Sequence, residues 1–167
     1  MPATNKLPNL GEALAPILKQ VPADQQPLLI ALTERMAAGR YREWAANVVD
    51  PRQRSLLLAC AAREDEVATL VESLYPQAAS MQRKILMSIP ELAETTQALF
   101  AAYDIQDQYR LQAQGERLGA STWRSFAKHT TDPRAAELFT RCAFLEEESA
   151  VVLETILGGA ADADAGT

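Results

Sequence analysis

Residues 34–64 read ERMAAGRYREWAANVVDPRQRSLLLACAARE, and residues 116–146 read ERLGASTWRSFAKHTTDPRAAELFTRCAFLE. Both stretches begin and end with glutamate, and both carry Asp-Pro-Arg near the middle. Aspartate followed by proline is typical of a helix start, because aspartate caps free amide groups and proline needs no hydrogen bond at the first helical position. Each stretch therefore predicts two helices joined by a tight turn.

The two stretches belong to a longer internal repeat, in which each residue corresponds to the one 82 positions later. Residues 7–75 align with residues 89–157 without insertion, and about 20 of the 69 pairs are identical. Two copies of such a long unit do not make a solenoid, whose repeats are shorter and more numerous. The repeat instead indicates a tandem-duplicated helical hairpin and a bundle with pseudo-twofold symmetry.

The composition indicates one helical domain. A chain of 167 residues is long enough to bury a proper core. Hydrophobic residues make up 48% and charged residues 23%, as in ordinary globular proteins, while alanine is common and glycine is scarce. We expect a single domain over residues 7–157, with flexible termini at 1–6 and 158–167.

Charge and hydropathy exclude several kinds of partner. The net charge is −6 and the pI is about 4.9, so the basic footprint of a nucleic-acid-binding protein is missing. Apolar runs are short and broken by charges, which argues against a membrane segment. The first residues lack the plan of a signal peptide, and two cysteines fit a reducing compartment. We therefore expect no nucleic-acid or membrane partner and a cytoplasmic location.

The helix pattern predicts an all-α, up-down four-helix bundle with two short accessory helices. Residues 76–103 are too long for a simple turn between hairpins and contain a short helix, so they predict one crossover, as in bundles of the ferritin type. The last helix is expected to end at Gly158-Gly159. The short helices are predicted over residues 9–20 and 91–102, and the long ones over 24–48, 51–75, 104–130 and 133–157.

The glutamates at the ends of the repeated stretches should share one level of the bundle. Glu34 and Glu64 each lie 15 residues from Val49 at the turn, on opposite sides of it. At about 1.5 Å rise per residue, both are roughly 22 Å from the turn of an antiparallel pair. Glu116 and Glu146 repeat this arrangement. The four carboxylates are therefore predicted at mid-height.

Helical periodicity also predicts that these glutamates face inward. Each is the ionisable exception on an apolar stripe formed by residues three, four and seven positions away. Gln112 is the one polar neighbour on the third stripe, whereas Glu66 and Glu148 should face water. The stripes comprise Ile30, Ala31, Ala37, Ala38 and Tyr41; Leu57, Cys60, Val67, Ala68 and Val71; Ala113, Gly119, Ala120 and Trp123; and Phe139, Cys142, Ser149, Ala150 and Leu153.

Four carboxylates in an apolar interior need protons, cationic side chains or metal. Hard carboxylate oxygens suit iron or manganese, so a divalent metal pair is one solution. Alternatively, Arg35, Arg117 or Arg63 form an internal ion-pair network with the glutamates. In a third interpretation, the bundle is rotated so that one or two of the glutamates are exposed.

Other side chains on the same stripes are candidates for contacts with the carboxylates. Cys60 and Cys142 are either extra ligands or redox partners, or small core residues. Tyr41 and Trp123 either hydrogen-bond to the cluster or take part in electron transfer, or they are aromatic core residues. His129 is the single histidine and is expected near a helix end, so no nucleophilic triad can be assembled. A glycine-rich phosphate loop is also missing, and no organic cofactor is expected.

The chain resembles the rubrerythrin branch of the ferritin-like superfamily. The resemblance rests on Glu34-x6-Tyr41-x2-Trp44-Ala45, on Ala61-x2-Glu64 and on the duplicated layout, and it covers nearly the whole chain. In that family, each hairpin contributes one glutamate from its first helix and Glu-x-x-His from its second to a pair of irons. The resemblance implies that the metal ligands are Glu34, Glu64, Glu116 and Glu146.

The histidines of that family pattern are missing. Val67 stands three residues after Glu64, and Ser149 stands three residues after Glu146. The usual di-iron site is therefore absent, which leaves either an all-carboxylate metal site or a structural relic.

Two functional hypotheses follow. In the first, the four glutamates bind iron or manganese for storage, peroxide detoxification or an oxidoreductase reaction. In the second, the chain is a metal-free binding or scaffold protein of the same fold, in which Arg35 and Arg117 compensate the carboxylates. Because ferritin-like bundles often self-associate, a homodimer is also considered.

Overall fold

The computed structural model describes the backbone of residues 6–165 and the side chains of residues 6–160. This part of the chain is all-helical and has no strand, as the sequence predicts. None of its helices has the length and apolar character needed to cross a membrane. The elements are α1 (Leu10–Leu18), the 3-10 turn η1 (Ala23–Gln25), α2 (Gln26–Asn47), α3 (Pro51–Glu72), α4 (Ala78–Ser88), α5 (Leu92–Ala101), α6 (Ile105–His129) and α7 (Pro133–Ala165).

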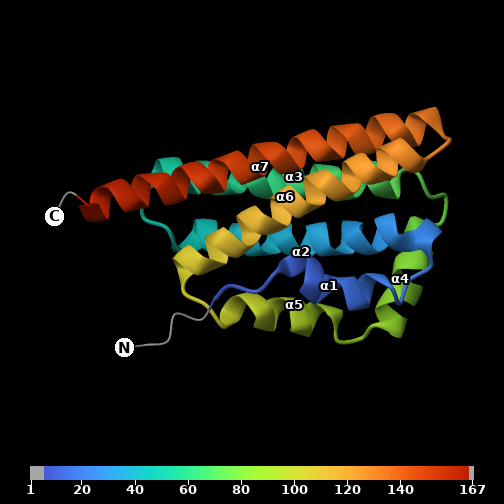
Figure 1. Cartoon of the computed structure of the whole chain (residues 1–167), viewed down its shortest axis with the longest axis horizontal. Helices are drawn as coiled ribbons and strands as arrows, with labels where there is room; N and C mark the ends of the chain where they lie inside the picture. The colour runs from blue at the N-terminus through green and yellow to red at the C-terminus, as the bar shows by residue number, and fades with distance from the viewer. Residues whose placement is uncertain (1–5, 166–167) are drawn as a thin grey trace.

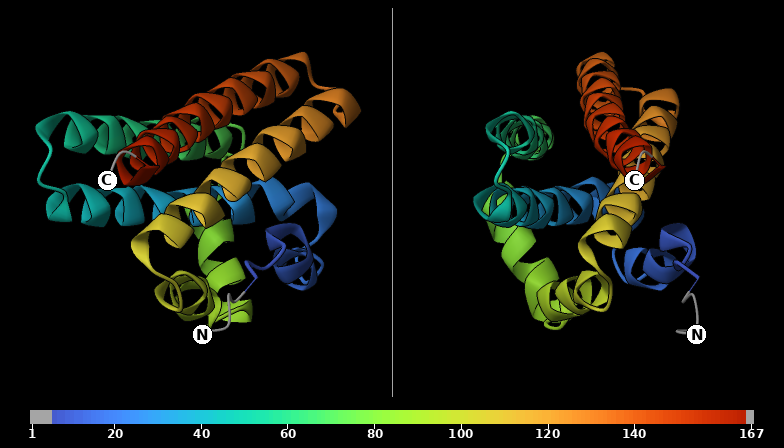
Figure 2. Two further views of the ribbon diagram at one scale, coloured as in Figure 1. Left: turned by 60° about the vertical axis from the view of Figure 1, so that its left-hand side comes forward. Right: turned by 90° about the vertical axis from the view of Figure 1, so that its left-hand side faces the viewer.

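The four long helices pack around a shared interior. The helices α2 and α3 form one antiparallel hairpin, and α6 and α7 form another (Figure 1). The helix α3 packs against α7, while Arg40 and Trp44 of α2 hydrogen-bond to side chains of α6. Viewed along the long axis, the four rods surround a common space (Figure 2).

The connection between the hairpins returns along the length of the molecule. After α3, the chain passes through α4 and α5 back to the other end, so α6 runs in the same direction as α3 (Figure 1). The connection contains two helices rather than the one expected, which makes three short helices with α1. The additional helix, α4, forms because residues 78–88 contain neither glycine nor proline and are rich in helix formers. All three short helices lie on the side of α2 and α6 (Figure 2).

The second helix of each hairpin begins with the aspartate cap that the sequence predicts. Asp50 accepts a hydrogen bond from the backbone amide of Arg52 at 3.0 Å, and Asp132 accepts one from the amide of Arg134 at 2.9 Å. Both aspartates precede a proline at the first helical position. These caps fix the turns, and with them the relative height of residues on the paired helices.

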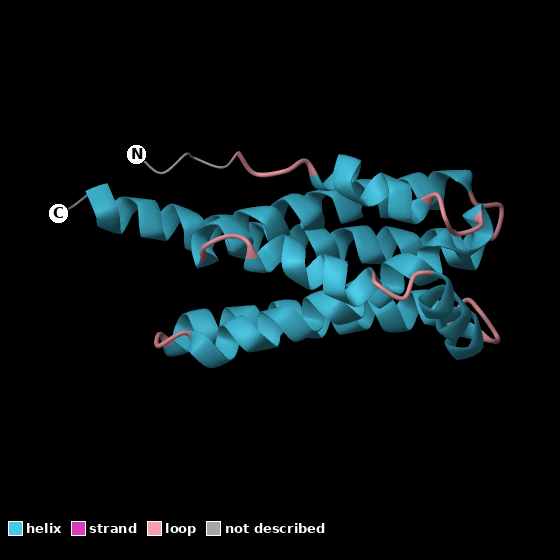
Figure 3. Cartoon of the chain, turned by 90° about the horizontal axis from the view of Figure 1, so that it is seen from below, coloured by secondary structure: helices cyan, strands magenta, loops and turns pink. Residues whose placement is uncertain are grey.

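The end of α7 differs from the sequence prediction. The helix does not stop at Gly158-Gly159 but continues to Ala165, beyond the ends of the neighbouring helices (Figure 3). Neither glycine has a positive φ, so neither forms a left-handed helix cap. A helical glycine costs only about 1 kcal/mol relative to alanine, and the alanines that follow favour the helix. The remaining residues of the predicted flexible termini, 1–5 and 166–167, lie outside the described part.

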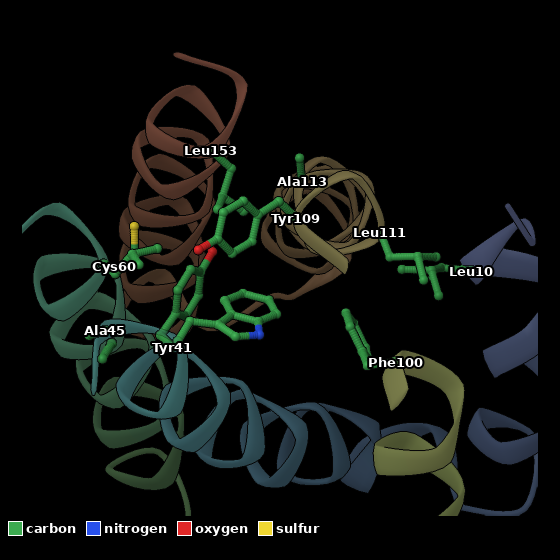
Figure 4. Packing of buried hydrophobic residues seen from close by; sticks show 12 residues of the cluster. Leu10, Tyr41, Ala45, Cys60, Phe100, Tyr109, Leu111, Ala113 and Leu153 are labelled. Carbon is green, nitrogen blue, oxygen red and sulfur yellow. The ribbon is translucent and has the colours of Figure 1, made fainter. Parts of the chain in front are cut away.

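The core is divided into clusters that flank the glutamates along the long helices. One cluster contains Tyr41, Trp44 and Tyr109, and Figure 4 shows Tyr41 and Tyr109 directed into the space between α2 and α6. Another contains Trp123 and Phe139 near the opposite end of α6 and α7. On each long helix the buried glutamate lies between residues of these two clusters.

Candidate functional site

The four predicted glutamates all point into the interior. Their exposed fractions are 8% for Glu34, 1% for Glu64, 1% for Glu116 and 2% for Glu146. One carboxylate oxygen from each of Glu34, Glu64 and Glu146 lies within 4.8 Å of the others. The alternative in which a rotated bundle exposes one or two of them is therefore wrong.

Glu116 lies beside this group of three and has its own donors. Its Oε1 accepts hydrogen bonds from Tyr41 Oη at 2.6 Å and from Gln112 Nε2 at 2.8 Å. Its carboxyl also helps to raise the pKa of Glu146, after burial and the charges of Glu34 and Glu64. The fourth carboxylate is thus adjacent to the cluster, although it does not belong to the closest set of oxygens.

Two further neutral donors hold the other carboxylates. Trp123 Nε1 donates to Glu146 Oε1 at 2.9 Å, and Ser149 Oγ donates to Glu64 Oε1 at 3.1 Å. Hydrogen bonds from Tyr41 and Trp123 to the cluster are one of the alternatives that the sequence left open, beside electron transfer and aromatic core packing. Ser149, which stands at a position where the resemblance implies histidine, instead acts as a hydrogen-bond donor.

Two carboxylate oxygens are buried without a hydrogen-bond partner among the described residues: Glu64 Oε2 and Glu116 Oε2. A buried acceptor without a partner costs about 1–3 kcal/mol, and more when it is charged. In each of these glutamates the other oxygen is already held by a donor. These two oxygens are therefore available to an incoming hydrogen-bond donor or cation.

Burial and mutual repulsion disfavour ionisation of the cluster. Burial raises the pKa of Glu34 to about 7, and the charge of Glu116 adds to the increase, while hydrogen bonds with Glu64 and Glu146 oppose it. Burial and then repulsion from Glu116 raise the pKa of Glu64 well above its ordinary range. Burial and then repulsion from Glu34 do the same for the pKa of Glu146. In the absence of a cation, burial favours the protonated forms of Glu34, Glu64 and Glu146.

The arginines next to the first-helix glutamates do not neutralise the cluster. Arg35 forms ion pairs with Asp65 at 2.9 Å and with Glu72 at 2.8 Å. Arg117 pairs with Glu154 at 2.8 Å on the outside of the second hairpin. A residue next to an inward-facing one points about 100° away from it on a helix, so both arginines reach outward. The prediction that Arg35 and Arg117 compensate the carboxylates is therefore wrong.

Two other arginines approach the site only through neutral side chains. Arg63 Nε donates to Ser149 Oγ at 3.1 Å. Arg40 donates to Gln112 Oε1 from Nε at 3.1 Å and from Nη2 at 2.9 Å, and its guanidinium lies 3.7 Å from the centre of the Phe100 ring. Within residues 6–160, no basic side chain forms an ion pair with any of the four glutamates.

The two cysteines are buried beside the cluster and are not among its closest atoms. Burial raises the pKa of the Cys60 thiol and raises that of Cys142 to about 12. Cys60 Sγ accepts a hydrogen bond from Arg63 Nη2 at 3.3 Å, and Cys142 Sγ lies 4.0 Å from the carbonyl oxygen of Val67. As neutral thiols packed between helices, they match the alternative in which cysteine is a core residue.

Two expectations about residues outside the site are confirmed. His129 is exposed at the end of α6, where its Nδ1 lies 2.7 Å from the carbonyl oxygen of Ser125. Glu66 and Glu148, each two residues after an interior glutamate, face outward.

Three residues that were not predicted to contact the glutamates also shape the site. A Cβ placed on Gly119 would lie 2.9 Å from Glu146 Oε2, so a glycine allows this carboxylate to approach the backbone of α6. Arg40 holds Gln112, which in turn holds Glu116. Gln112 was recognisable as the polar residue on an apolar stripe, but nothing in the local sequence distinguishes Arg40 or Gly119.

No protein-family model, no curated protein and no solved structure matches this chain. Its function is therefore inferred from the chemistry of the site.

Proposed function

We propose that this chain is a ferritin-like protein that binds one or two iron or manganese ions inside its helical bundle. The observation that carries the proposal is the set of three buried carboxylate oxygens within 4.8 Å of one another, none of which pairs with a basic side chain of residues 6–160. Hard divalent ions prefer such oxygens and would remove the repulsion between the carboxylates. The ligands would be Glu34, Glu64, Glu116 and Glu146.

The donors around the carboxylates support this assignment. Carboxylate ligands of metals are commonly oriented by hydrogen bonds from surrounding side chains. Ser149 holds one oxygen of Glu64, and Tyr41 and Gln112 hold one oxygen of Glu116, which leaves the second oxygen of each glutamate without a partner.

The arrangement of the chain supports the ferritin-like and duplicated character of the proposal. Ion pairs recur at positions 82 apart: Arg35–Glu72 corresponds to Arg117–Glu154, and Arg42–Asp65 corresponds to Arg124–Glu147. A single crossover between two antiparallel hairpins is also the connection found in ferritin-like folds.

The chemical role follows from the ion rather than from an acid–base residue. Bound iron or manganese would supply electron transfer to an oxidant such as peroxide, or the ion itself would be the stored cargo. The chain's own side chains would hold the ion and keep bulk water from it. Tyr41 and Trp123 would orient Glu116 and Glu146 by their hydrogen bonds.

The direct test is elemental analysis of protein purified without chelators and then incubated with Fe²⁺ or Mn²⁺. We expect near-stoichiometric metal in the wild type and a loss of at least tenfold in affinity in Glu64→Gln/Glu146→Gln. The matched control is Glu66→Gln/Glu148→Gln, which removes the same charges from exposed positions of the same helices. A wild type that takes up neither ion, or a control that loses metal equally, would contradict the proposal.

The raised pKa values favour a second candidate, a metal-free bundle whose carboxyls share protons and which serves as a binding or scaffold protein. Glutamine mimics a protonated carboxyl, so Glu64→Gln would then be as stable as the wild type or more stable. This outcome, combined with absence of metal uptake, would select the second candidate.

A further inference from the structure

An apolar pocket of about 240 Å³ extends from α1 to the carboxylates. Its walls come from α1, α2, α5 and α6, with Glu146 added from α7, and they include Leu14, Ile17 and Leu99. On α1 only Leu10 is buried, while Leu14 and Ile17 remain half-buried. The apolar side chains of this short helix therefore border the pocket instead of completing the core.

The inner part of the pocket is rich in hydrogen-bond acceptors. Glu34, Glu116 and Glu146 all contribute to its lining. Arg40 also lines the pocket, but two of its N–H groups are already engaged by Gln112. A group that enters this end meets three carboxyls and a guanidinium whose Nε and Nη2 are bonded to Gln112. Carboxyl oxygens accept hydrogen bonds whether or not the group is ionised, so a head group with a hydrogen-bond donor fits this end of the pocket.

The volume indicates the size of the occupant. A buried apolar cavity of about 150 Å³ accommodates benzene, so the larger pocket suits a molecule of roughly eight to ten non-hydrogen atoms. Its walls are mostly aliphatic, which suits a flexible hydrocarbon chain better than a polar metabolite.

We propose that this pocket binds a medium-chain aliphatic molecule whose hydroxyl head lies at the carboxylates and whose hydrocarbon tail lies along α1. The head-group end shares Glu34, Glu116 and Glu146 with the proposed metal site, so the inference is tested on metal-free protein. Whether the molecule is a substrate or a ligand, it is recognised by an apolar tail and a donor head.

Isothermal titration calorimetry with metal-free wild type at about pH 8 tests this inference. We expect 1-octanol to bind with saturation at one site. Ethanol, which lacks most of the tail, should bind at least about a hundredfold more weakly, given the free energy of burying each CH₂ group. Octanoate should bind at least tenfold more weakly, because its carboxylate offers no hydrogen-bond donor to the carboxyl oxygens. Absence of saturable 1-octanol binding, or octanoate binding as tightly as 1-octanol, would overturn the proposal.

Ala15→Phe locates the binding in the pocket, because Ala15 lines it from α1. The matched control is Ala13→Phe, which adds the same ring at an exposed position of the same helix. We expect the first variant to weaken 1-octanol binding at least tenfold and the second to leave it unchanged. If both variants bound 1-octanol equally well, the binding site would not lie in this pocket. The comparisons of chain length and head group use the wild type, so they test the proposal even if Ala15→Phe does not fold.

Metal uptake, measured on separate samples of the same protein incubated with Fe²⁺ or Mn²⁺, separates this inference from the proposed function. Metal uptake without 1-octanol binding would overturn the pocket inference alone. Binding of 1-octanol without metal uptake would overturn only the metal proposal.

Discussion

Neutral donors, not charges, hold the interior glutamates. Tyr41, Trp123, Gln112 and Ser149 each donate to one carboxylate oxygen, and the nearby arginines reach the site only through such side chains. A neutral donor orients a carboxylate without cancelling its charge. The positions of these glutamates are therefore fixed while their need for a proton or a cation persists.

Gly119→Ala should disturb the site through a single methyl group. The added Cβ would lie 2.9 Å from Glu146 Oε2, so the carboxylate must move. We expect about 1–3 kcal/mol of destabilisation in urea unfolding and at least tenfold weaker binding of the proposed metal. The matched control is Gly39→Ala, where nothing lies within 4 Å of the added atom. This control should be stabilised by about 0.4–1 kcal/mol. Equal effects of the two substitutions would contradict the close approach at Gly119.

Tyr41→Phe should cost more stability than Tyr109→Phe, although both side chains are buried in the same aromatic cluster. The first change removes a 2.6 Å hydrogen bond between the buried Tyr41 and Glu116 side chains, which should cost about 1–3 kcal/mol. The second removes only a 3.4 Å contact with Gln53 and should cost less than about 1 kcal/mol. Chemical denaturation of both variants measures the difference, which should disappear if the phenol of Tyr41 does not hold Glu116.

At the scale of helices, the two hairpins are built alike and the connecting elements differ. Each hairpin turn is capped by an aspartate before proline, and each hairpin carries a matching ion pair on its outer side. Because these pairs are exposed, they contribute little to stability. The stability of the hairpins therefore comes mainly from the packing of their apolar faces. The short helices α1, α4 and α5 cover one side of the four long helices (Figure 2).

Gly158→Ala tests whether α7 continues as a helix past Gly158. In a continuous helix, alanine should stabilise the protein by up to about 1 kcal/mol, because no atom lies within 4 Å of the new Cβ. If Gly158 instead ended the helix in a left-handed conformation, alanine would be strained and the protein would lose stability. Thermal unfolding distinguishes a gain from a loss, and circular dichroism checks the helix content.

For the whole molecule, the carboxylate cluster links folding to pH. The pKa of Glu34 is about 7 in the folded chain against an ordinary value of 4.5, so the folded state binds more protons than the unfolded state between these values. Stability from this group is complete below about pH 4.5 and is lost as the pH rises through 7. Glu64 and Glu146 have pKa shifts in the same direction and extend the loss to higher pH.

We therefore expect metal-free protein to lose stability between about pH 5 and 8, by on the order of 3 kcal/mol from Glu34 alone. Urea unfolding after chelator treatment measures this slope. Glu34→Gln should reduce it, because glutamine does not titrate. Saturating metal should oppose the trend, since metal binds the deprotonated ligands and its affinity rises with pH. A metal-free protein that gains stability over this range would contradict the raised pKa values.

Much of the fold could be read from local sequence. The Asp50-Pro51 and Asp132-Pro133 caps placed two helix starts, and apolar periodicity predicted which face of each long helix is buried. Equal spacing from the turn predicted the common level of Glu34 and Glu64, because rise per residue is constant in a helix. The additional helix α4 and the extension of α7 were missed because weak propensities decided them.

The sequence by itself determined the helical class, the long helices and the inward direction of the four glutamates, since these depend on propensities and periods that act within one helix. Only the tertiary structure decided which partners the glutamates meet. It turned Arg35 and Arg117 toward Asp65, Glu72 and Glu154, and it brought Tyr41, Trp123 and Ser149 to the carboxylates. It also formed the pocket beneath α1. The physical reason is that side-chain partners from different helices depend on how the helices rotate and approach, and no single stretch of sequence encodes these quantities.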